Sequence, residues 1–389
     1  MNTVSLNSVS HAAEQADGRK PADGVLLFCV IALMVFGCLA VYSSVAYFAE
    51  NKGDTAAGFL FKHGYKLVLA FIAMFVAAKI NYYYVAAFSK AVLILSWLLL
   101  LWVNFYGGDV HGARRSLTVA GFAFQPSSVA MLALLMYLCR MMAEKRSYIE
   151  DFWRSFVPAL TWIGVTALLV GLQDFSSAAL ILGLSFMMMF VGRMSLKHLG
   201  LLLLLGGVLG GILVSQTLER QSRLTNYVGH VLTIQSQVLV GSDAGYQAQQ
   251  AHIAIAQGGL LGVGAGKSTQ RNFLPAPYND YIYAIIAEEY GLIGALILLF
   301  IYVVILLRGI IFVANRARDE LGTYMAMACT LAIVVYGFVN AAVATGLFPV
   351  TGLPMPFISY GGTSMLTAGF MMGVLMNISK HPQEEPEDA

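Results

Sequence analysis

Two adjacent arginines, Arg114 and Arg115, are the first residues of this chain whose types and spacing suggest chemistry. They are followed by Gln125-Pro126-Ser127-Ser128. Two neighbouring guanidinium groups can clamp a phosphate or a diphosphate through paired hydrogen bonds. The same pair could instead anchor the protein to lipid headgroups, and the spacing alone leaves both roles open.

A second candidate segment runs from Ser242 to Gly291 and is rich in glycine and poor in charge. Its scarce ions are Asp243, Asp280, Glu288, Glu289, Lys267 and Arg271. Acids are costly in so apolar a chain unless they are hydrated or paired, so each acid is a functional candidate. Glu288 and Glu289 could also be favoured by the dipole at the start of a helix. Asp243 lies in a glycine-flanked loop, where no such structural explanation applies.

The triplet Gly266-Lys267-Ser268 resembles the end of a nucleotide-binding P-loop. That motif requires a glycine five residues before the glycine that precedes its lysine, and here that position is Leu261. We therefore reject nucleotide binding. We expect a glycine-rich turn that lets the backbone approach a ligand closely, with Lys267 and Arg271 supplying positive charge.

The third segment, Gly352–Ser364, has the sequence GLPMPFISYGGTS and leads into the last apolar run. Its prolines and glycines predict a rigid, non-helical entry at membrane depth. Such backbone is tolerated only where it packs in protein or lines a cavity. A purely structural re-entrant turn is the alternative.

The histidines and cysteines predict neither a metal centre nor a disulfide framework. His230 and His252 lack the close spacing of zinc ligands. Four cysteines lie inside apolar stretches without a CxxC pair, at Cys29, Cys38, Cys139 and Cys329. No cofactor is firmly predicted, and a loosely held Mg²⁺ between Asp243 and a diphosphate stays open.

Composition places these segments in a membrane protein. Hydrophobic residues make up 58% of the 389 residues and charged residues 11%, whereas soluble domains carry about 25% charged residues. The net charge of +2 gives no reason to expect a nucleic-acid partner. The first apolar run, 24–48, exceeds the core of a signal peptide, which spans about 7–15 residues, so we expect a retained helix.

The apolar runs set the predicted fold, because crossing a bilayer core of about 30 Å takes about 20 helical residues. We predict an all-α polytopic membrane protein with a cytoplasmic extension at 1–23, a membrane domain at 24–380 and an acidic cytoplasmic tail at 381–389. A large extracytoplasmic loop at about 218–280 would separate the seventh and eighth spans. Ten transmembrane helices are expected, at about 24–48, 63–80, 84–105, 127–143, 156–172, 177–192, 198–217, 281–307, 322–345 and 360–379.

The distribution of lysine and arginine predicts that both termini are cytoplasmic. With that orientation 14 of the 23 bases lie inside and nine lie outside. Cations kept outside against the positive-inside rule are candidates for ligand binding. They are Lys52, Lys62, Lys66, Arg114, Arg115, Arg220, Arg223, Lys267 and Arg271.

Together the three segments resemble the SEDS family of shape, elongation, division and sporulation proteins, over about residues 24 to 380. The stretch PMPFISYGGTS is close to the family's PLPFISYGGSS-like motif. GARRSL is similar to GARRW, and FLPAPYNDYIYAIIAEEYGLIG to FLPExHTDFIFAxxxEExGxxG. The Phe-Ile version of the motif and the polar N-terminal extension resemble the FtsW members more than the RodA members.

The resemblance implies ten membrane helices and a peptidoglycan glycosyltransferase that polymerises lipid II, an undecaprenyl-pyrophosphate-linked disaccharide peptide. The reaction would occur at the outer face of the bacterial cytoplasmic membrane during septal cell-wall synthesis. The implied partners are a class B penicillin-binding protein, which crosslinks the product, and other divisome membrane proteins. A lipid II flippase and a non-catalytic divisome scaffold are the alternatives. Charged candidates clustered at the outer face favour the enzyme over the flippase.

The site residues are carried over by position. The family's essential loop Asp stands five residues before the Gly of GYQ, where this chain has Val240, so we assign catalysis to Asp243, two residues before Gly245. Ser128 replaces the Glu of QPSE, and Gln173-Asp174-Phe175 lacks the proline of QPDFG. Substrate binding is assigned to Arg114, Arg115, Lys267, Gln270, Arg271, Asp280, Glu288, Glu289, Ser359, Tyr360, Gly361, Gly362 and Thr363.

Overall fold

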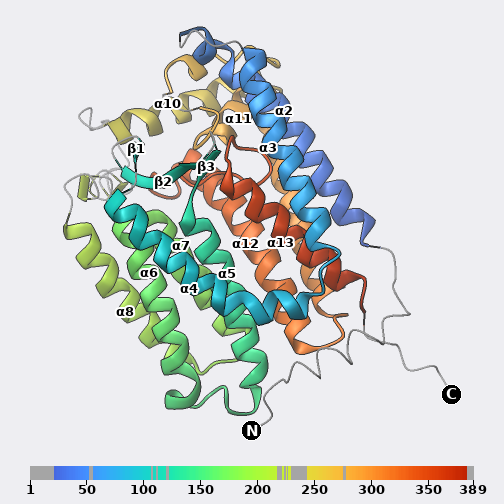
Figure 1. The fold of residues 1–389 in the computed structure, drawn as a ribbon. Coiled ribbons are helices and arrows are strands. Elements are labelled where there is room, and N and C mark those ends of the chain that lie inside the picture. Colours follow the sequence, from blue (N-terminus) through green and yellow to red (C-terminus); the bar gives the residue numbers. More distant parts are fainter. Residues whose placement is uncertain are drawn as a thin grey trace, which may run out of the picture.

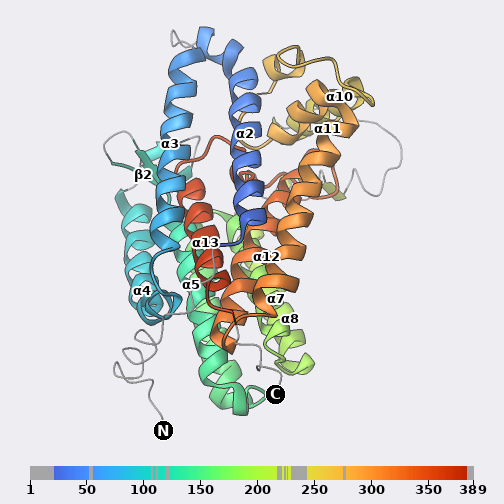
Figure 2. The ribbon, with the colours of Figure 1, turned by 90° about the vertical axis from the view of Figure 1, so that its right-hand side faces the viewer.

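The chain forms a bundle of long helices with a small sheet and a short helix gathered at one end (Figure 1, Figure 2). The computed structural model describes residues 22–51, 56–106, 108–110, 113–119, 122–216, 221–222, 225, 227–228, 243–274 and 277–382. Most of the predicted N-terminal extension, the acidic tail after Pro382 and the stretch 229–242 of the predicted long loop lie outside the described residues.

The first half of the bundle contains α2 (Gly24–Asn51), α3 (Ala56–Ala77), α4 (Tyr82–Tyr106), α5 (Pro126–Glu144), α6 (Val157–Gln173), α7 (Phe175–Val191) and α8 (Leu196–Ser215). Two short helical turns, η1 (Arg146–Tyr148) and η2 (Phe152–Phe156), join α5 to α6. The second half contains α10 (Asp243–Gly258), η3 (Gln270–Asn272), α11 (Ile282–Leu307), η4 (Arg308–Ala314), α12 (Glu320–Ala344) and α13 (Thr363–Ser379).

A helical, multi-pass membrane fold is therefore confirmed. Each of the ten predicted spans overlaps one helix, and eight of these helices are long and apolar enough to cross a membrane. The other two, α7 and α13, have 17 residues each. Seventeen residues lie at the lower limit of what spans a bilayer core, about 17–25 residues.

Two helices form the centre of the bundle. In α5, 72% of the most apolar window is buried within the protein, and in α12 the share is 61%. The corresponding shares are 17% in α8 and 22% in α3, whose apolar side chains face outward. In a membrane protein such outward apolar surface is the surface that lipid covers, so α8 and α3 lie at the lipid boundary.

Helices α3 and α13 pack closely because of two glycines one turn apart. A Cβ atom on Gly369 would lie 2.2 Å from the carbonyl oxygen of Ala70, and one on Gly373 would lie 2.3 Å from that of Met74. Small residues at this spacing let membrane helices approach backbone to backbone. Asn377 continues the same face, accepting a hydrogen bond from the backbone N–H of Tyr82 at 3.2 Å.

The described chain starts and ends at the same end of the bundle. The backbone N–H of Asp23 donates to Ser379 Oγ at 3.3 Å, and the Asp23 carboxylate pairs with Arg308 Nε at 2.6 Å. Nearby, Tyr82 and Tyr83 both donate to the carboxylate of Asp319, at 2.9 and 2.5 Å. These contacts join α2, α4, α12 and α13 at the end opposite the sheet.

A three-stranded antiparallel sheet, which the predicted all-α fold lacks, lies between α4 and α5. Its strands follow the order β1 (Gly108–Val110), β2 (Ala113–Val119), β3 (Phe122–Phe124). In its register Ser116 faces Gly108, and Leu117 faces Phe124. Strands this short carry little periodic signal, which is why apolar runs alone did not indicate them.

A pair of alanine substitutions tests the helix contact. Gly369→Ala should lower the thermal unfolding temperature of the detergent-purified protein, because the new methyl group meets the Ala70 carbonyl. Gly183→Ala in α7 is the matched control, since a Cβ there has no neighbour within 4 Å. It should be neutral or stabilise by about 0.5–1 kcal/mol through reduced chain entropy. Equal melting temperatures for the two variants would contradict the close approach of α3 and α13.

Candidate functional site

The site is built around a break in α11. Gly291 has φ 69° and ψ −170°, so the helix hydrogen bonds are interrupted there. The carbonyls of Glu288 and Glu289 accept hydrogen bonds from another segment, at 2.9 Å from the N–H of Val263 and at 3.0 Å from that of Gly264. The glycine-rich turn that follows α10 thus completes the hydrogen bonding of the broken helix.

Glycine is required on both sides of this contact. Gly262 has φ 81°, and a Cβ on it would lie 2.2 Å from the Glu289 carbonyl oxygen. A Cβ on Gly291 would lie 2.4 Å from the carbonyl oxygen of Leu260. Only glycine combines a positive φ with so little space. The close backbone approach that we predicted for a ligand is made here to α11.

The carboxylate of Glu288 fastens the next stretch of the same loop. It accepts hydrogen bonds from the Ser268 hydroxyl, from the Thr269 N–H at 2.8 Å and from the Gln270 N–H at 3.3 Å. The side chain is fully buried. A buried carboxylate is tolerated when several donors replace its water, and hydrogen bonds to charged groups contribute about 1.5–3 kcal/mol each.

Glu289 joins this loop to α2. Its Oε1 accepts a hydrogen bond from the Ser43 hydroxyl and lies 3.4 Å from the Ser268 N–H. Arg271 donates from Nη1 to the Ser43 carbonyl at 2.8 Å. The second oxygen, Oε2, is buried without a hydrogen-bond partner in the described part of the chain. We call Ser43, Ser268, Arg271, Glu288 and Glu289 the acid cluster.

The helix dipole does not explain these two acids. Ile282 begins α11, so Glu288 and Glu289 lie in its second turn. The favourable effect of the dipole on an acid falls off within the first turn. Their hydrogen bonds with the loop and with α2 account for their burial instead.

A second set of contacts holds the end of the loop against the proline-rich segment. The Tyr360 N–H donates to the Tyr278 carbonyl at 2.9 Å, and the Ser359 hydroxyl donates to the Asn279 carbonyl at 2.7 Å. The same hydroxyl accepts from the Met355 N–H at 2.8 Å. Ser359 therefore shapes this region by fixing backbone.

Asp280 is placed by the same junction. The side-chain amide of Asn340, on α12, donates to the Asp280 carbonyl at 3.0 Å and to the Leu353 carbonyl at 2.8 Å. The Asp280 carboxylate approaches Gly352, where a Cβ would lie 3.7 Å from Oδ2. The non-helical entry predicted for the last span is thus packed in protein.

Residues that the site prediction omitted gather around Tyr360. Lys66 Nζ lies 3.5 Å from the centre of the Tyr360 ring, and the His63 ring stacks on Tyr360 at 5.8 Å between centres. Tyr278 meets the same ring edge-on at 5.6 Å. Burial raises the pKa of Tyr278, and Tyr360 and Asp280 raise it further. Its phenol therefore stays protonated at neutral pH.

The sequence did hold a signal for this group. Lys62 and Lys66 were among the bases assigned to the outer side against the positive-inside rule, and in the structure they contact the rings of Phe59 and Tyr360. These lysines and Tyr360 are almost 300 positions apart in the sequence, so no local pattern could predict that they lie close together.

The last span is also tied to the start of α5. The Gln125 N–H donates to Thr363 Oγ1 at 2.8 Å, and Gly361 and Gly362 lead into α13 at Thr363. The Ser128 side chain, where a Glu was expected, is buried in the first turn of α5. Asp174 caps α7 by accepting from the N–H groups of Ser176 and Ser177.

Three predicted residues are placed by their backbone. Arg114 and Arg115 lie in β2. Asp243, expected in a glycine-flanked loop without a structural explanation, is instead the first residue of α10, where the helix dipole favours an acid. The side chains of all three lie outside the described residues. Lys267 is exposed, and Gln270 is buried next to the acid cluster. Strand β2, α10 and the start of α13 share one end of the bundle (Figure 1).

This end of the protein therefore combines cations with fixed polar backbone above a lipid-covered bundle. Lys66, Lys267 and Arg271 come from α3 and the loop, and β2 adds two arginines. Guanidinium and ammonium groups gathered near a membrane surface suit a diphosphate that carries a lipid chain.

Comparisons with known proteins show which family the chain belongs to. A family model described as "Cell cycle protein", which covers FtsW, RodA and SpoVE, matches residues 24–384. This chain belongs to that family. Stage V sporulation protein E of Bacillus subtilis (strain 168) is 33% identical to this SEDS-family chain over 92% of it and 97% of the relative. The probable peptidoglycan glycosyltransferase FtsW of Geobacter metallireducens is 32% identical over 94% of this chain and 96% of the relative.

Two solved structures have the same fold as this chain. A chain from a peptidoglycan synthase complex, described as coordinating polymerization and crosslinking, superposes with a TM-score of 0.74 at 23% identity, covering 92% of this chain and 97% of that chain. The rod shape determining protein RodA of Thermus thermophilus superposes with a TM-score of 0.67 at 22% identity, covering 92% and 96%. At these identities the likeness establishes a common fold.

Removing the charge of Glu288 tests whether the acid cluster fastens the loop. Glu288→Gln keeps the side-chain shape but weakens the hydrogen bonds from Ser268, Thr269 and Gln270. We expect amide hydrogen exchange across 267–272 to accelerate by about tenfold or more, for a loss of about 1.5–3 kcal/mol. The matched control is Glu144→Gln, an exposed acid paired with Arg140. Unchanged exchange in Glu288→Gln would contradict the role of the cluster.

Proposed function

We propose that this chain is a peptidoglycan glycosyltransferase that polymerises lipid II at the outer face of the bacterial cytoplasmic membrane. Curated relatives that match more than nine-tenths of the chain carry the name probable peptidoglycan glycosyltransferase FtsW. The observation that carries the proposal is the acid cluster, because it holds the loop that follows α10, the helix that begins at Asp243, against α11 and α2.

The proposed reaction joins two lipid-linked sugars. The 4-hydroxyl of an acceptor sugar attacks the anomeric carbon of a donor, a new glycosidic carbon–oxygen bond forms, and the bond to the polyprenyl diphosphate breaks. The hydroxyl loses its proton to a base, and the diphosphate leaves with the electron pair. The reaction therefore needs a base near the hydroxyl and cations near the departing diphosphate.

In this proposal Asp243 is the base or orients the hydroxyl. Arg114, Arg115, Lys267 and Arg271 stabilise the leaving diphosphate. The half-buried guanidinium of Arg271 is held by Ser43, so its direction is fixed before substrate arrives. Preorganised charge of this kind lowers a barrier without a cost of reorganisation during the reaction.

In this proposal the remaining predicted residues hold the loop and the neighbouring backbone in place and take no part in the chemical step. Glu288, Glu289 and Gln270 hold the loop, while Ser359 and Thr363 fix backbone at the entry of the last span. Asp280, Tyr360, Gly361 and Gly362 would shape the surface that the substrate meets between these segments. Lys66 joins the proposal as a further cation next to Tyr360.

The cellular setting is part of the same proposal. We infer both termini to be cytoplasmic, in agreement with the predicted bias of lysine and arginine and with the shared end of Asp23 and Ser379. A class B penicillin-binding protein would crosslink the product, with other divisome membrane proteins nearby. A structural neighbour comes from a peptidoglycan synthase complex, which supports a partner of this kind. Septal synthesis is favoured by the FtsW-like motifs.

No firm cofactor enters this proposal. A loosely held Mg²⁺ between Asp243 and the diphosphate stays an alternative, and turnover with and without a chelator separates the two cases. Chelation should leave the folded protein intact, because the described contacts that hold the loop are hydrogen bonds within the chain.

Polymerisation of lipid II by the purified protein tests the function. Asp243→Asn should lower the rate by about 10²–10⁴, the loss expected for a catalytic base. Glu144→Gln, at an exposed acid paired with Arg140, should polymerise at the parental rate. The assay is run with and without a class B penicillin-binding protein, so that a requirement for the partner is seen separately.

Two outcomes would contradict the proposal. Full polymerisation by a folded Asp243→Asn variant would remove Asp243 from the mechanism. Transport of lipid II across vesicles by a parent protein that forms no glycan strands, with or without the partner, would favour the flippase.

A further inference from the structure

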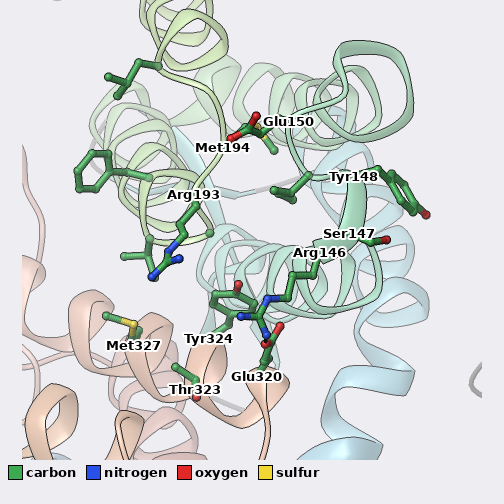
Figure 3. Close-up of a pocket in the computed structure, with 15 residues that line it drawn as sticks. Arg146, Ser147, Tyr148, Glu150, Arg193, Met194, Glu320, Thr323, Tyr324 and Met327 are labelled. Atoms are coloured by element: carbon green, nitrogen blue, oxygen red, sulfur yellow. Dashed lines mark ion pairs between the residues drawn. The ribbon is translucent and has the colours of Figure 1, made fainter.

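A pocket is lined by segments that lie at the end of the bundle opposite the sheet and α10 (Figure 1, Figure 3). It has a volume of about 1050 Å³. Its walls come from three places, namely the turns after α5 (Arg146–Glu150), the turn between α7 and α8 (Phe190–Leu196) and the first turns of α12 (Glu320–Met327). The proposed glycosyl transfer uses none of these residues.

One cation in this pocket lacks a partner. The guanidinium of Arg193 extends into the space between the α7–α8 turn and α12 (Figure 3), and it makes no ion pair or hydrogen bond with any residue that the structure describes. Arg146, the other arginine of the lining, pairs with Glu320. Glu150, the second acid, forms no ion pair with Arg193. Arg193 is therefore the available positive charge of the pocket.

The backbone at Arg193 adopts a conformation that normally belongs to glycine. Its φ is 58°, and the Met194 N–H donates to the Met189 carbonyl at 3.1 Å while the Arg193 N–H donates to the Phe190 carbonyl at 3.0 Å. This pair of bonds is the Schellman motif, whose left-handed residue is usually glycine. A side chain there is strained, because the left-handed conformation brings Cβ close to the following carbonyl oxygen.

The glycine next to it does not supply this conformation. Gly192 precedes Arg193, has φ −68°, and a Cβ on it would lie 2.5 Å from Met142 Sδ. Gly192 is thus explained by packing against α5, whereas Arg193 occupies the strained position without a packing reason. A strained residue whose charge points into a cavity is a candidate for ligand binding.

The apolar part of the lining is exposed. Phe190 is 60% exposed and Leu196 is 72% exposed, and both lie at the edges of the α7–α8 turn. Most of α8 is similarly outward-facing. Among the described residues, the pocket therefore offers an unpaired guanidinium on one side and exposed apolar side chains on the other.

We propose that this pocket binds an anionic glycerophospholipid of the leaflet at this end of the protein. Arg193 would hold the phosphate, and the acyl chains would lie along Phe190 and Leu196. Basic pockets between membrane helices on the cytoplasmic side are suited to anionic headgroups. A soluble phosphate or an acidic peptide would use the guanidinium but would leave the exposed apolar wall uncovered.

The first experiment uses Arg193→Gly and nanodiscs of phosphatidylcholine alone or mixed with phosphatidylglycerol. The parent should melt at a higher temperature in the mixture and should retain phosphatidylglycerol in native mass spectrometry. Arg193→Gly should melt at or above the parental temperature in phosphatidylcholine, because glycine relieves the left-handed strain. It should lose both the shift in the mixture and the retained lipid.

Charge-matched variants separate a site from general attraction. Arg193→Gln should lose the shift, whereas Arg154→Gln should keep it, because Arg154 is exposed at the same end but lies outside the pocket. Arg193→Gln also provides the test if Arg193→Gly melts below the parent in phosphatidylcholine.

Three results would overturn the proposal. The first is a parental shift and retained lipid in both Arg193 variants. The second is an equal loss of the shift in Arg154→Gln, which would reduce the effect to surface charge. The third is an equal shift of the parent with inorganic phosphate, which would make the occupant a free anion. Each result is independent of polymerisation, so failure here leaves the proposed function untouched.

Discussion

The buried carboxylates of Glu288 and Glu289 are the constraint on which the candidate site depends. An ionised acid inside a membrane protein is stable only where donors replace its water. Here the donors come from Ser268, Thr269 and Gln270 for one acid and from Ser43 for the other. The hydrogen bonds of these two buried carboxyl groups therefore hold one loop, α2 and α11 in a single arrangement. Breaking α11 at Gly291 lets the same loop use the helix carbonyls as well.

Local sequence predicted much of the fold, because twenty apolar residues have few options other than a membrane helix. It also predicted which segments meet at one end, through the placement of Arg114, Lys267 and the proline-rich entry. Local sequence could not predict which distant residues form hydrogen bonds with one another. Ser43 and Glu289 are 246 positions apart, and Gln125 and Thr363 are 238 apart. Such pairs depend on how helices pack, and helix packing leaves no short-range pattern.

The break in α11 and the small sheet were missed for related reasons. A single glycine within an apolar run gives no sign of a break in the helix. The positive φ of Gly291 becomes understandable only from its contact with the neighbouring loop. The three strands are short, and two of them have three residues each. The positive φ of Arg193, at the other end of the bundle, was missed as well. It depends on the hydrogen bonds at the C-terminal end of α7, which the residue type does not indicate.

The central claim is that the loop held by the acid cluster faces outward, and cysteine labelling tests it most directly. In a background with Cys29, Cys38, Cys139 and Cys329 replaced by alanine, Lys267→Cys and Arg154→Cys are each treated in intact cells with a membrane-impermeant maleimide. The account predicts labelling at position 267 in intact cells, and labelling at position 154 only after the membrane is permeabilised. Labelling of position 154 from outside, with position 267 protected until permeabilisation, would contradict it.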